Sequence, residues 1–143
     1  MPRKPKRFNC LEKDVLKSVE HAMYSDANVF IHRVNTGAFK TEDRFIRCGT
    51  PGQSDFSGIV KEIRCPVCRV LLGKGVRLEI ECKAPNGTVS PKQAEWIDMI
   101  NAMGGIAFVI QPKAQEELFP VNIKKEINRN IYQPCSRCQR GEN

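Results

Sequence analysis

A strict alternation of apolar and charged residues over 76–84 is the clearest pattern in the sequence. Valine, leucine, isoleucine and cysteine occupy every second position, with arginine, glutamate and lysine between them, which predicts a strand with one apolar and one charged face. A continuous apolar run at 106–110 predicts a central strand covered on both faces. Shorter runs predict further strands at 29–34, 44–48 and 55–60.

Two segments have the features of helices. Apolar residues recur at helical spacing over 10–23, and Asn9 with Glu12 has the pattern of a capping box that would start this helix. A second helix is predicted to follow Ser90, because a proline suits its first position and Gln93 completes another capping box. Two glycines are expected to end this second helix.

The remaining segments indicate one domain with additions. Residues 1–8 are predicted to be a flexible basic arm, 61–75 a cysteine-bearing insertion in a hairpin, and 131–143 a cysteine-bearing tail. The segment 113–130 is expected to be partly helical. The order of helix, strands, helix, strand and helix predicts a single α/β domain over 9–143, with a mixed sheet flanked by helices.

The composition is that of a globular, basic protein. The chain has 143 residues, of which 41% are hydrophobic, and a formal net charge of +7. No apolar run approaches ~18 residues and the N-terminus has no apolar stretch, so we expect no membrane span, no secretory signal and a cytoplasmic location. The excess of lysine and arginine, dense at residues 2–7, indicates a polyanionic partner such as nucleic acid, although solubility alone also favours charge.

Four of the seven cysteines form two CxxC pairs, Cys65 with Cys68 and Cys135 with Cys138. In a reducing compartment such pairs suit one tetrahedral Zn²⁺ ion. Because all four ligands would be thiolates, the zinc would be structural and would join distant parts of the fold. Two unrelated exposed pairs, or a redox-active pair, are the alternatives. The other three are expected to be small buried hydrophobes: Cys10, Cys48 and Cys82.

The charged face of the strand at 76–84 carries a candidate site. Glu81 and Lys83 are two residues apart and therefore share a face. If the strand that begins at Asp55 is a neighbour, Asp55 and Glu81 converge, and two carboxylates suit Mg²⁺. Lysine beside them can stabilise developing negative charge. The alternatives are a half-exposed strand face for the Glu-x-Lys pair and a turn-capping role for the aspartate.

In this order the motifs resemble a known nuclease family. Asp55 followed by Glu81-Cys82-Lys83 resembles the signature of the PD-(D/E)xK nuclease superfamily, and more specifically the virus-type replication-repair nuclease family, VRR-NUC, in its stand-alone viral or phage type. The resemblance covers about residues 9–110. The matching segments are 33–37, 49–55, 79–83 and 90–93, together with Trp96 and the glycines 104–105.

This resemblance implies a fold and a set of roles. The fold would be a restriction-endonuclease-like core, a central mixed sheet flanked by helices, with the zinc-stapled insertion added. Asp55 and Glu81 would bind Mg²⁺ or Mn²⁺. The backbone carbonyl of Cys82 would be a further ligand, and Lys83 would be the catalytic lysine.

Two more residues match the family. Gln93 matches its active-site glutamine, and Glu12 matches an acidic residue of the first helix that lies near the metal. Each has an alternative role, because each also completes a capping box. Ser54 stands where the superfamily name has proline, at a position that varies.

The resulting hypothesis is a metal-dependent DNA endonuclease. The resemblance implies a structure-specific enzyme, similar to Holliday-junction resolvases, that acts on branched DNA as a homodimer, in the host cytoplasm if the protein is viral. The alternatives are a non-catalytic, zinc-stapled DNA-binding protein and a restriction-type nuclease on plain duplex. Trp96 is predicted to be a core anchor rather than a base-stacking platform, and His32 a strand residue rather than a ligand.

Overall fold

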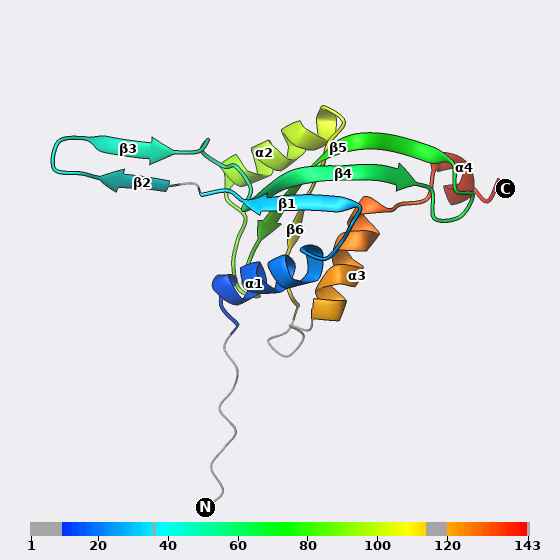
Figure 1. Cartoon of the computed structure of the whole chain (residues 1–143), viewed down its shortest axis with the longest axis horizontal. Helices are drawn as coiled ribbons and strands as arrows, with labels where there is room; N and C mark the ends of the chain where they lie inside the picture. Colours follow the sequence, from blue (N-terminus) through cyan, green and yellow to red (C-terminus); the bar gives the residue numbers. More distant parts are fainter. Residues whose placement is uncertain (1–9, 36, 114–119, 143) are drawn as a thin grey trace, which may run out of the picture.

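The computed structural model describes residues 10–35, 37–113 and 120–142, and a four-stranded mixed sheet lies at its centre. The strands follow the order β1-β4-β5-β6 (Figure 1). β1 pairs antiparallel with β4, β4 antiparallel with β5, and β5 parallel with β6. The strands are β1 Val29–Arg33, β4 Phe56–Arg64, β5 Leu71–Cys82 and β6 Ile106–Ile110. The predicted α/β architecture with a mixed sheet is confirmed.

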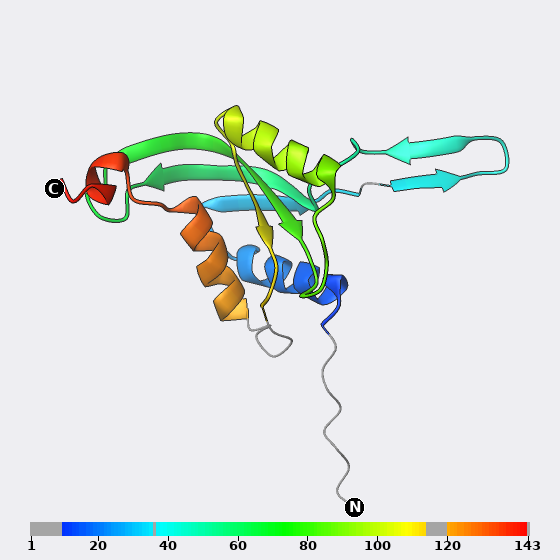
Figure 2. The same cartoon turned by 180° about the vertical axis from the view of Figure 1, so that it is seen from behind.

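Helices cover both faces of this sheet. α1 (Glu12–Met23) and α3 (Pro120–Ile131) pack against each other on one face, whereas α2 (Pro91–Ala102) lies on the other (Figure 2). α2 forms the crossover that a parallel β5–β6 pair requires. The main core lies between α1, α3 and the sheet, where the apolar positions of β5 meet the apolar faces of both helices.

The two predicted capping boxes have different outcomes. The second is confirmed, because the hydroxyl of Ser90 accepts the N–H of Gln93 at 3.2 Å and the amide oxygen of Gln93 accepts the N–H of Ser90 at 2.9 Å. The first is wrong. α1 begins at Glu12, so this residue is not the third of the helix, and Asn9 lies outside the described residues. Instead, Asp14 accepts the N–H of the residue before the helix at 2.9 Å.

The predicted insertion at 61–75 is wrong as a separate segment. Most of it continues the two central strands, with Glu62 of β4 opposite Lys74 of β5, and only 65–70 form the turn. The glycine-rich, polar sequence of 73–75 is typical of a loop. Most side chains of 71–75 are exposed, however, so this part of β5 does not need the alternation of a buried strand.

The apolar run at 106–110 does form a strand, β6, but β6 is an edge strand and not the predicted central one. Its two faces are covered by α2 and α3, which explains why all five side chains are apolar. Hydrophobicity indicates what covers the faces of a strand. It does not indicate how many strands are hydrogen-bonded to it.

A β-hairpin projects from the body of the protein beyond β1 and α2 (Figures 1 and 2). It consists of β2 (Gly37–Lys40) and β3 (Phe45–Cys48), which pair antiparallel as a separate two-stranded sheet. The sequence predicted β3 but not β2, because a four-residue strand that begins at a glycine has no clear alternation.

The C-terminal segments complete the described fold. The predicted partly helical segment 113–130 contains most of α3, and the cysteine-bearing tail contains the short helix α4 (Ser136–Gln139). The predicted basic arm, 1–8, lies outside the described residues. Within the described ranges, no helix has the length and apolar character needed to cross a bilayer.

Candidate active site and cysteine cluster

Asp55, Glu81 and Lys83 lie together at one end of the sheet. Phe56 is the register partner of Ile80 in the β4–β5 pair, so Asp55, just before β4, lies beside the end of β5. One carboxylate oxygen of Asp55, Oδ2, accepts the backbone N–H of Cys82 at 2.8 Å. Nζ of Lys83 lies 3.3 Å from Oε1 of Glu81. The three predicted residues therefore form one cluster.

Gln93 joins this cluster from α2. Its side-chain N–H donates to Oε1 of Glu81 at 2.7 Å, while its amide oxygen accepts the N–H of Ser90. The sequence left two roles open for Gln93, a helix cap and a site residue. In the structure the amide oxygen of Gln93 makes the cap, and its amide nitrogen contacts Glu81. The cap fixes the rotamer of Gln93 and so points its N–H at Glu81.

The carboxylate of Glu81 is an unusual group electrostatically. It is only 2% exposed, and the pKa of Glu81 is raised to about 7, first by burial and then by the negative charge of Asp55. The negative charge of Glu12 raises it further, whereas the ammonium of Lys83 lowers it. Glu12, at the exposed start of α1, thus acts on the site through its charge, and the structure records no hydrogen bond between them in the described residues.

The donor set of this cluster fits a hard divalent cation. The hydrogen bonds above use Oδ2 of Asp55 and Oε1 of Glu81, so the second oxygen of each carboxylate remains for a ligand. Carboxylate and carbonyl oxygens are the ligands that Mg²⁺ and Mn²⁺ prefer. The thiol of Cys82 is buried on the opposite face of β5, and burial raises the pKa of Cys82, so its side chain is not a ligand.

A buried glutamate beside the cluster was not predicted. Glu79 is 0% exposed, and three side chains donate to its carboxylate: Ser57 at 2.8 Å, Arg77 at 3.0 Å and the indole of Trp96 at 3.0 Å. Trp96 is half-buried and lies outside the hydrophobic core, so the predicted core anchor is wrong, and its indole instead makes a polar link to Glu79. A glutamate two residues before Glu81 on the same face was the available signal, because a carboxylate buried there needs several donors.

Together, Gln93 and Trp96 fasten α2 to β5. They lie three residues apart on α2, and their partners, Glu81 and Glu79, lie two residues apart on β5. The far end of α2 is held separately, by two hydrogen bonds of 2.9 Å and 2.8 Å between the side chain of Asn101 and the backbone of Ala107. The charged face of β5 is consequently buried under α2 at Glu79, Glu81 and Lys83.

The buried serine before Asp55 has no polar partner. Ser54 is 1% exposed, and its hydroxyl makes no hydrogen bond to the residues that the structure describes. A small residue fits here because the chain passes from the turn at 49–52 into β4 inside the core.

Without divalent ions the protein is expected to lose stability as the pH rises from 5 to 8, because of Glu81. A carboxyl with a raised pKa stabilises the fold below its unfolded pKa of 4.5, and this contribution disappears as the pH passes about 7. A shift of this size corresponds to roughly 3 kcal/mol. Urea unfolding at both pH values should show a smaller loss in Glu81→Gln than in wild type. The loss should be unchanged in Glu95→Gln, an exposed control on α2.

The four CxxC cysteines form a second cluster. Their sulfur atoms all lie within 4.8 Å of one another, and Sγ of Cys68 lies 3.7 Å from Sγ of Cys135. Four thiolates ~2.3 Å from one Zn²⁺ ion would be ~3.8 Å apart, whereas a disulfide would bring two sulfurs to ~2 Å. The predicted convergence of Cys65 and Cys138 with these two is confirmed, and the cluster can hold a structural zinc ion.

Local geometry favours the thiolate form of Cys65, whereas burial and the neighbouring cysteines raise the pKa of Cys138 to about 12. The backbone N–H of Cys135 donates to Sγ of Cys65 at 3.4 Å, and this bond, with N–H groups of the 65–70 turn, lowers the pKa of Cys65 to about 6. Cys65 and Cys68 lie at the turn between β4 and β5, whereas Cys135 is the N-cap of α4. The cluster thus joins α4 to the turn that follows β4, at the opposite end of β4 from Asp55 (Figure 1).

The three other cysteines follow the prediction with one difference. Cys10 and Cys82 are buried in the core, and Cys48 is half-buried at the end of β3.

The sequence matches no family model in the comparison with known protein families, and no curated protein matches it. The fold and the two clusters therefore carry the functional argument.

Proposed function

We propose that the protein is a Mg²⁺- or Mn²⁺-dependent endonuclease that hydrolyses phosphodiester bonds of DNA. The observation that carries the proposal is the cluster of Asp55, Glu81, Lys83 and Gln93, in which two carboxylates share a largely buried site with one cation. A protein that only binds phosphate gains nothing from paired carboxylates, because they repel DNA. A protein that positions a divalent ion needs them.

Each residue of the cluster has a chemical task in this proposal. Asp55 and Glu81 would hold the ion through their remaining oxygens, with the Cys82 carbonyl beside them. A bound Mg²⁺ or Mn²⁺ ion neutralises phosphate charge and lowers the pKa of water. Lys83 contributes a positive charge beside Glu81 for the negative charge that develops at phosphorus, and Gln93 keeps Glu81 in one orientation.

Two further aspects of the proposal rest on the resemblance to the PD-(D/E)xK superfamily. The mixed sheet flanked by helices, with the acidic cluster at one end, supports this resemblance. We propose branched DNA as the substrate and a homodimer as the active form, because a two-fold enzyme suits a substrate that is cut on two strands. The net charge of +7 supports a DNA partner.

A panel of end-labelled DNAs tests the proposal. A four-way junction, a flap, a splayed arm and a plain duplex are each incubated with no divalent ion, Mg²⁺, Mn²⁺ or Ca²⁺. We expect cuts in Mg²⁺ or Mn²⁺ only, and more on the branched DNAs. Specific fragments from linear duplex alone would favour the restriction-type alternative. Tight binding of DNA without cleavage under every condition would favour the non-catalytic alternative.

Trp96→Phe is expected to lower the rate of cleavage about 10- to 100-fold at saturating DNA, since a small displacement of Gln93 and Glu81 is costly to catalysis. The substitution removes the N–H that Glu79 accepts but keeps an aromatic ring. Asn101→Ala is the matched control, because it releases the other end of α2. Asn101→Ala should lower the melting temperature with little change in the rate of DNA cleavage. Equal rates for Trp96→Phe and wild type would contradict a positioning role.

A further inference from the structure

Part of the sheet face that carries α2 is open to solvent. α2 packs against β5 and β6, and the neighbouring strands carry large exposed side chains on the same face. Phe30 of β1 is 65% exposed and pairs in register with Ile59 of β4, which is 52% exposed and pairs in turn with Arg77 of β5. These three side chains form a row across the sheet.

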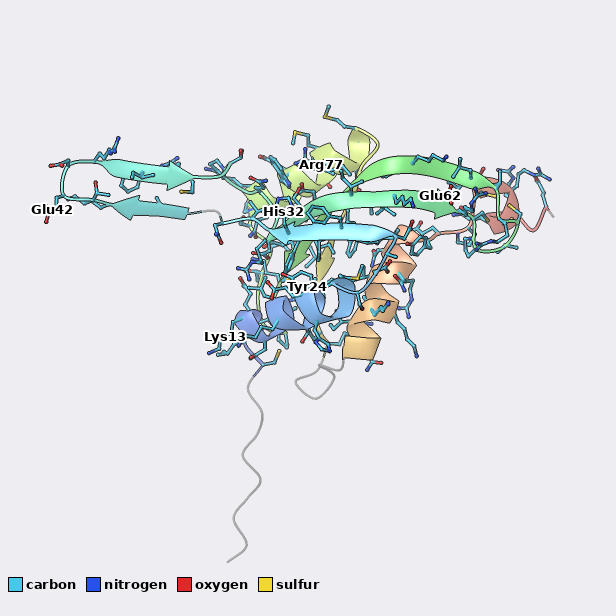
Figure 3. The ribbon with its side chains drawn as sticks, viewed as in Figure 1. Lys13, Tyr24, His32, Glu42, Glu62 and Arg77 are labelled. Carbon is cyan, nitrogen blue, oxygen red and sulfur yellow. The ribbon has the colours of Figure 1, made fainter. Side chains whose placement is uncertain are left out.

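A shallow hollow of about 350 Å³ lies over this row. It is lined by Phe30, His32, Ser57, Ile59, Gly75 and Arg77. Figure 3 shows His32 and Arg77 on the α2 side of the sheet, whereas Lys13 marks α1 on the other side. The strands approach closely beneath the hollow, since a Cβ on Gly58 would overlap the carbonyl oxygen of Phe30.

The rings of Phe30 and His32 in this hollow lie close enough together to stack with planar groups of a ligand. The centroids of Phe30 and His32 lie 5.9 Å apart with an interplanar angle of 32°, and both residues are exposed. Exposed aromatic rings on adjacent positions of a sheet are a common means of binding unpaired bases. The ring of Trp96 lies at the border of the row, where the guanidinium of Arg77 covers it at 5.8 Å.

Cations lie on the same face as the rings. Arg77 is held in place by the buried carboxylate of Glu79 at 2.8 Å, yet its side chain remains 51% exposed. Lys61, two residues after Ile59 on β4, is exposed as well. This face therefore combines apolar rings with positive charge, the combination that single-stranded DNA requires for its bases and phosphates.

The hollow and the acidic cluster lie along the same strands, β4 and β5, with buried Glu79 between them on β5. Arg77 and Glu81 lie four residues apart on the same face of β5, which corresponds to ~13 Å at ~3.3 Å per residue. Ser57, which lines the hollow, follows Asp55 by two residues on β4. A short stretch of nucleotides spans this distance.

We propose that the open face formed by Phe30, His32, Ile59, Lys61 and Arg77 binds an unpaired segment of DNA next to the site of cleavage. This inference deepens the proposed function and rests on it, because it names single-stranded character near the cut as the recognised feature. A second copy of the chain is a poorer occupant. Two-fold packing of this face would gather Arg77 and Lys61 of both copies in one interface, where like charges repel.

Phe30→Ala tests the proposal, with Phe45→Ala as the matched control, because Phe45 is equally exposed at 62% but lies on β3 of the projecting hairpin. Binding of a fluorescent 20-nucleotide oligo(dT) and of a duplex of equal length is measured by anisotropy, without divalent ions. We expect about 10-fold weaker oligo(dT) binding for Phe30→Ala. Duplex binding by Phe30→Ala and both affinities of Phe45→Ala should stay close to wild type. Phe30→Trp should restore tight binding.

Equal oligo(dT) affinity for Phe30→Ala and wild type would overturn the proposal. Sedimentation of both proteins accompanies the titration. If Phe30→Ala converted a wild-type dimer into a monomer, the face would be a contact between copies and the proposal would be wrong. Because binding is measured without cleavage, failure of the proposed nuclease activity in the labelled-DNA panel would be seen separately.

Discussion

Asp55→Asn is expected to reduce DNA cleavage in Mg²⁺ at least about a thousandfold while leaving the fold intact. Asparagine has the shape of aspartate, and its amide oxygen can still accept the N–H of Cys82, which Asp55 accepts at 2.8 Å. What it loses is the negative charge that a divalent ion requires. Single-turnover cleavage of the preferred branched DNA, at saturating protein, measures this loss without a contribution from binding.

Glu81→Gln and Lys83→Met should cause losses of similar size for different reasons. The first removes the second carboxylate of the ion site, and the second removes the cation that lies 3.3 Å from Glu81. Asp98→Asn, on the exposed surface of α2, is the control that should cleave like wild type. Calorimetric titration with Mn²⁺ should separate the two roles, since Glu81→Gln weakens ion binding more than Lys83→Met does. Wild-type cleavage by all three site variants would exclude this cluster as the active site.

Much of the cluster could be predicted because strand geometry is regular. The alternation at 76–84 placed Glu81 and Lys83 on one face, and the structure brings Asp55 beside them once β4 and β5 are neighbours. The cap at Ser90 likewise placed Gln93 at the start of α2. These placements depended on short-range periodicity, on a capping pattern and on the assumption that two consecutive strands pair, whereas the site role of Gln93 came from the family resemblance.

The parts that were missed depend on how helices pack over the sheet. The same alternation does not reveal that α2 buries the charged face, so the role of Glu79 and the polar link from Trp96 were not predicted. The open part of the face was missed for the same reason. Phe30 and Ile59 have the composition of core residues, and only the position of α2 leaves them exposed.

Loss of the cysteine cluster is expected to have the second large effect, this time on stability. The purified protein should contain one zinc ion per chain, since all four sulfurs lie within 4.8 Å of one another. Cys135→Ser should abolish stoichiometric zinc and destabilise the C-terminal part by several kcal/mol, because binding of zinc by four thiolates contributes directly to folding. Zinc content is measured by mass spectrometry of the metal, and stability by urea unfolding and limited proteolysis.

The position of the cluster determines which part of the protein should respond. Zinc would join α4 to the β4–β5 turn, whereas α3 is anchored independently through its buried isoleucines and through Tyr132, which accepts a hydrogen bond from Asn28 at 2.7 Å. Proteolysis of Cys135→Ser should therefore begin after residue 132, and cleavage of DNA at the distant acidic cluster should fall less than tenfold. Cys48→Ser, a half-buried cysteine outside the cluster, should keep both zinc and stability. Full zinc content in Cys135→Ser, or equal loss in Cys48→Ser, would contradict a single four-cysteine site.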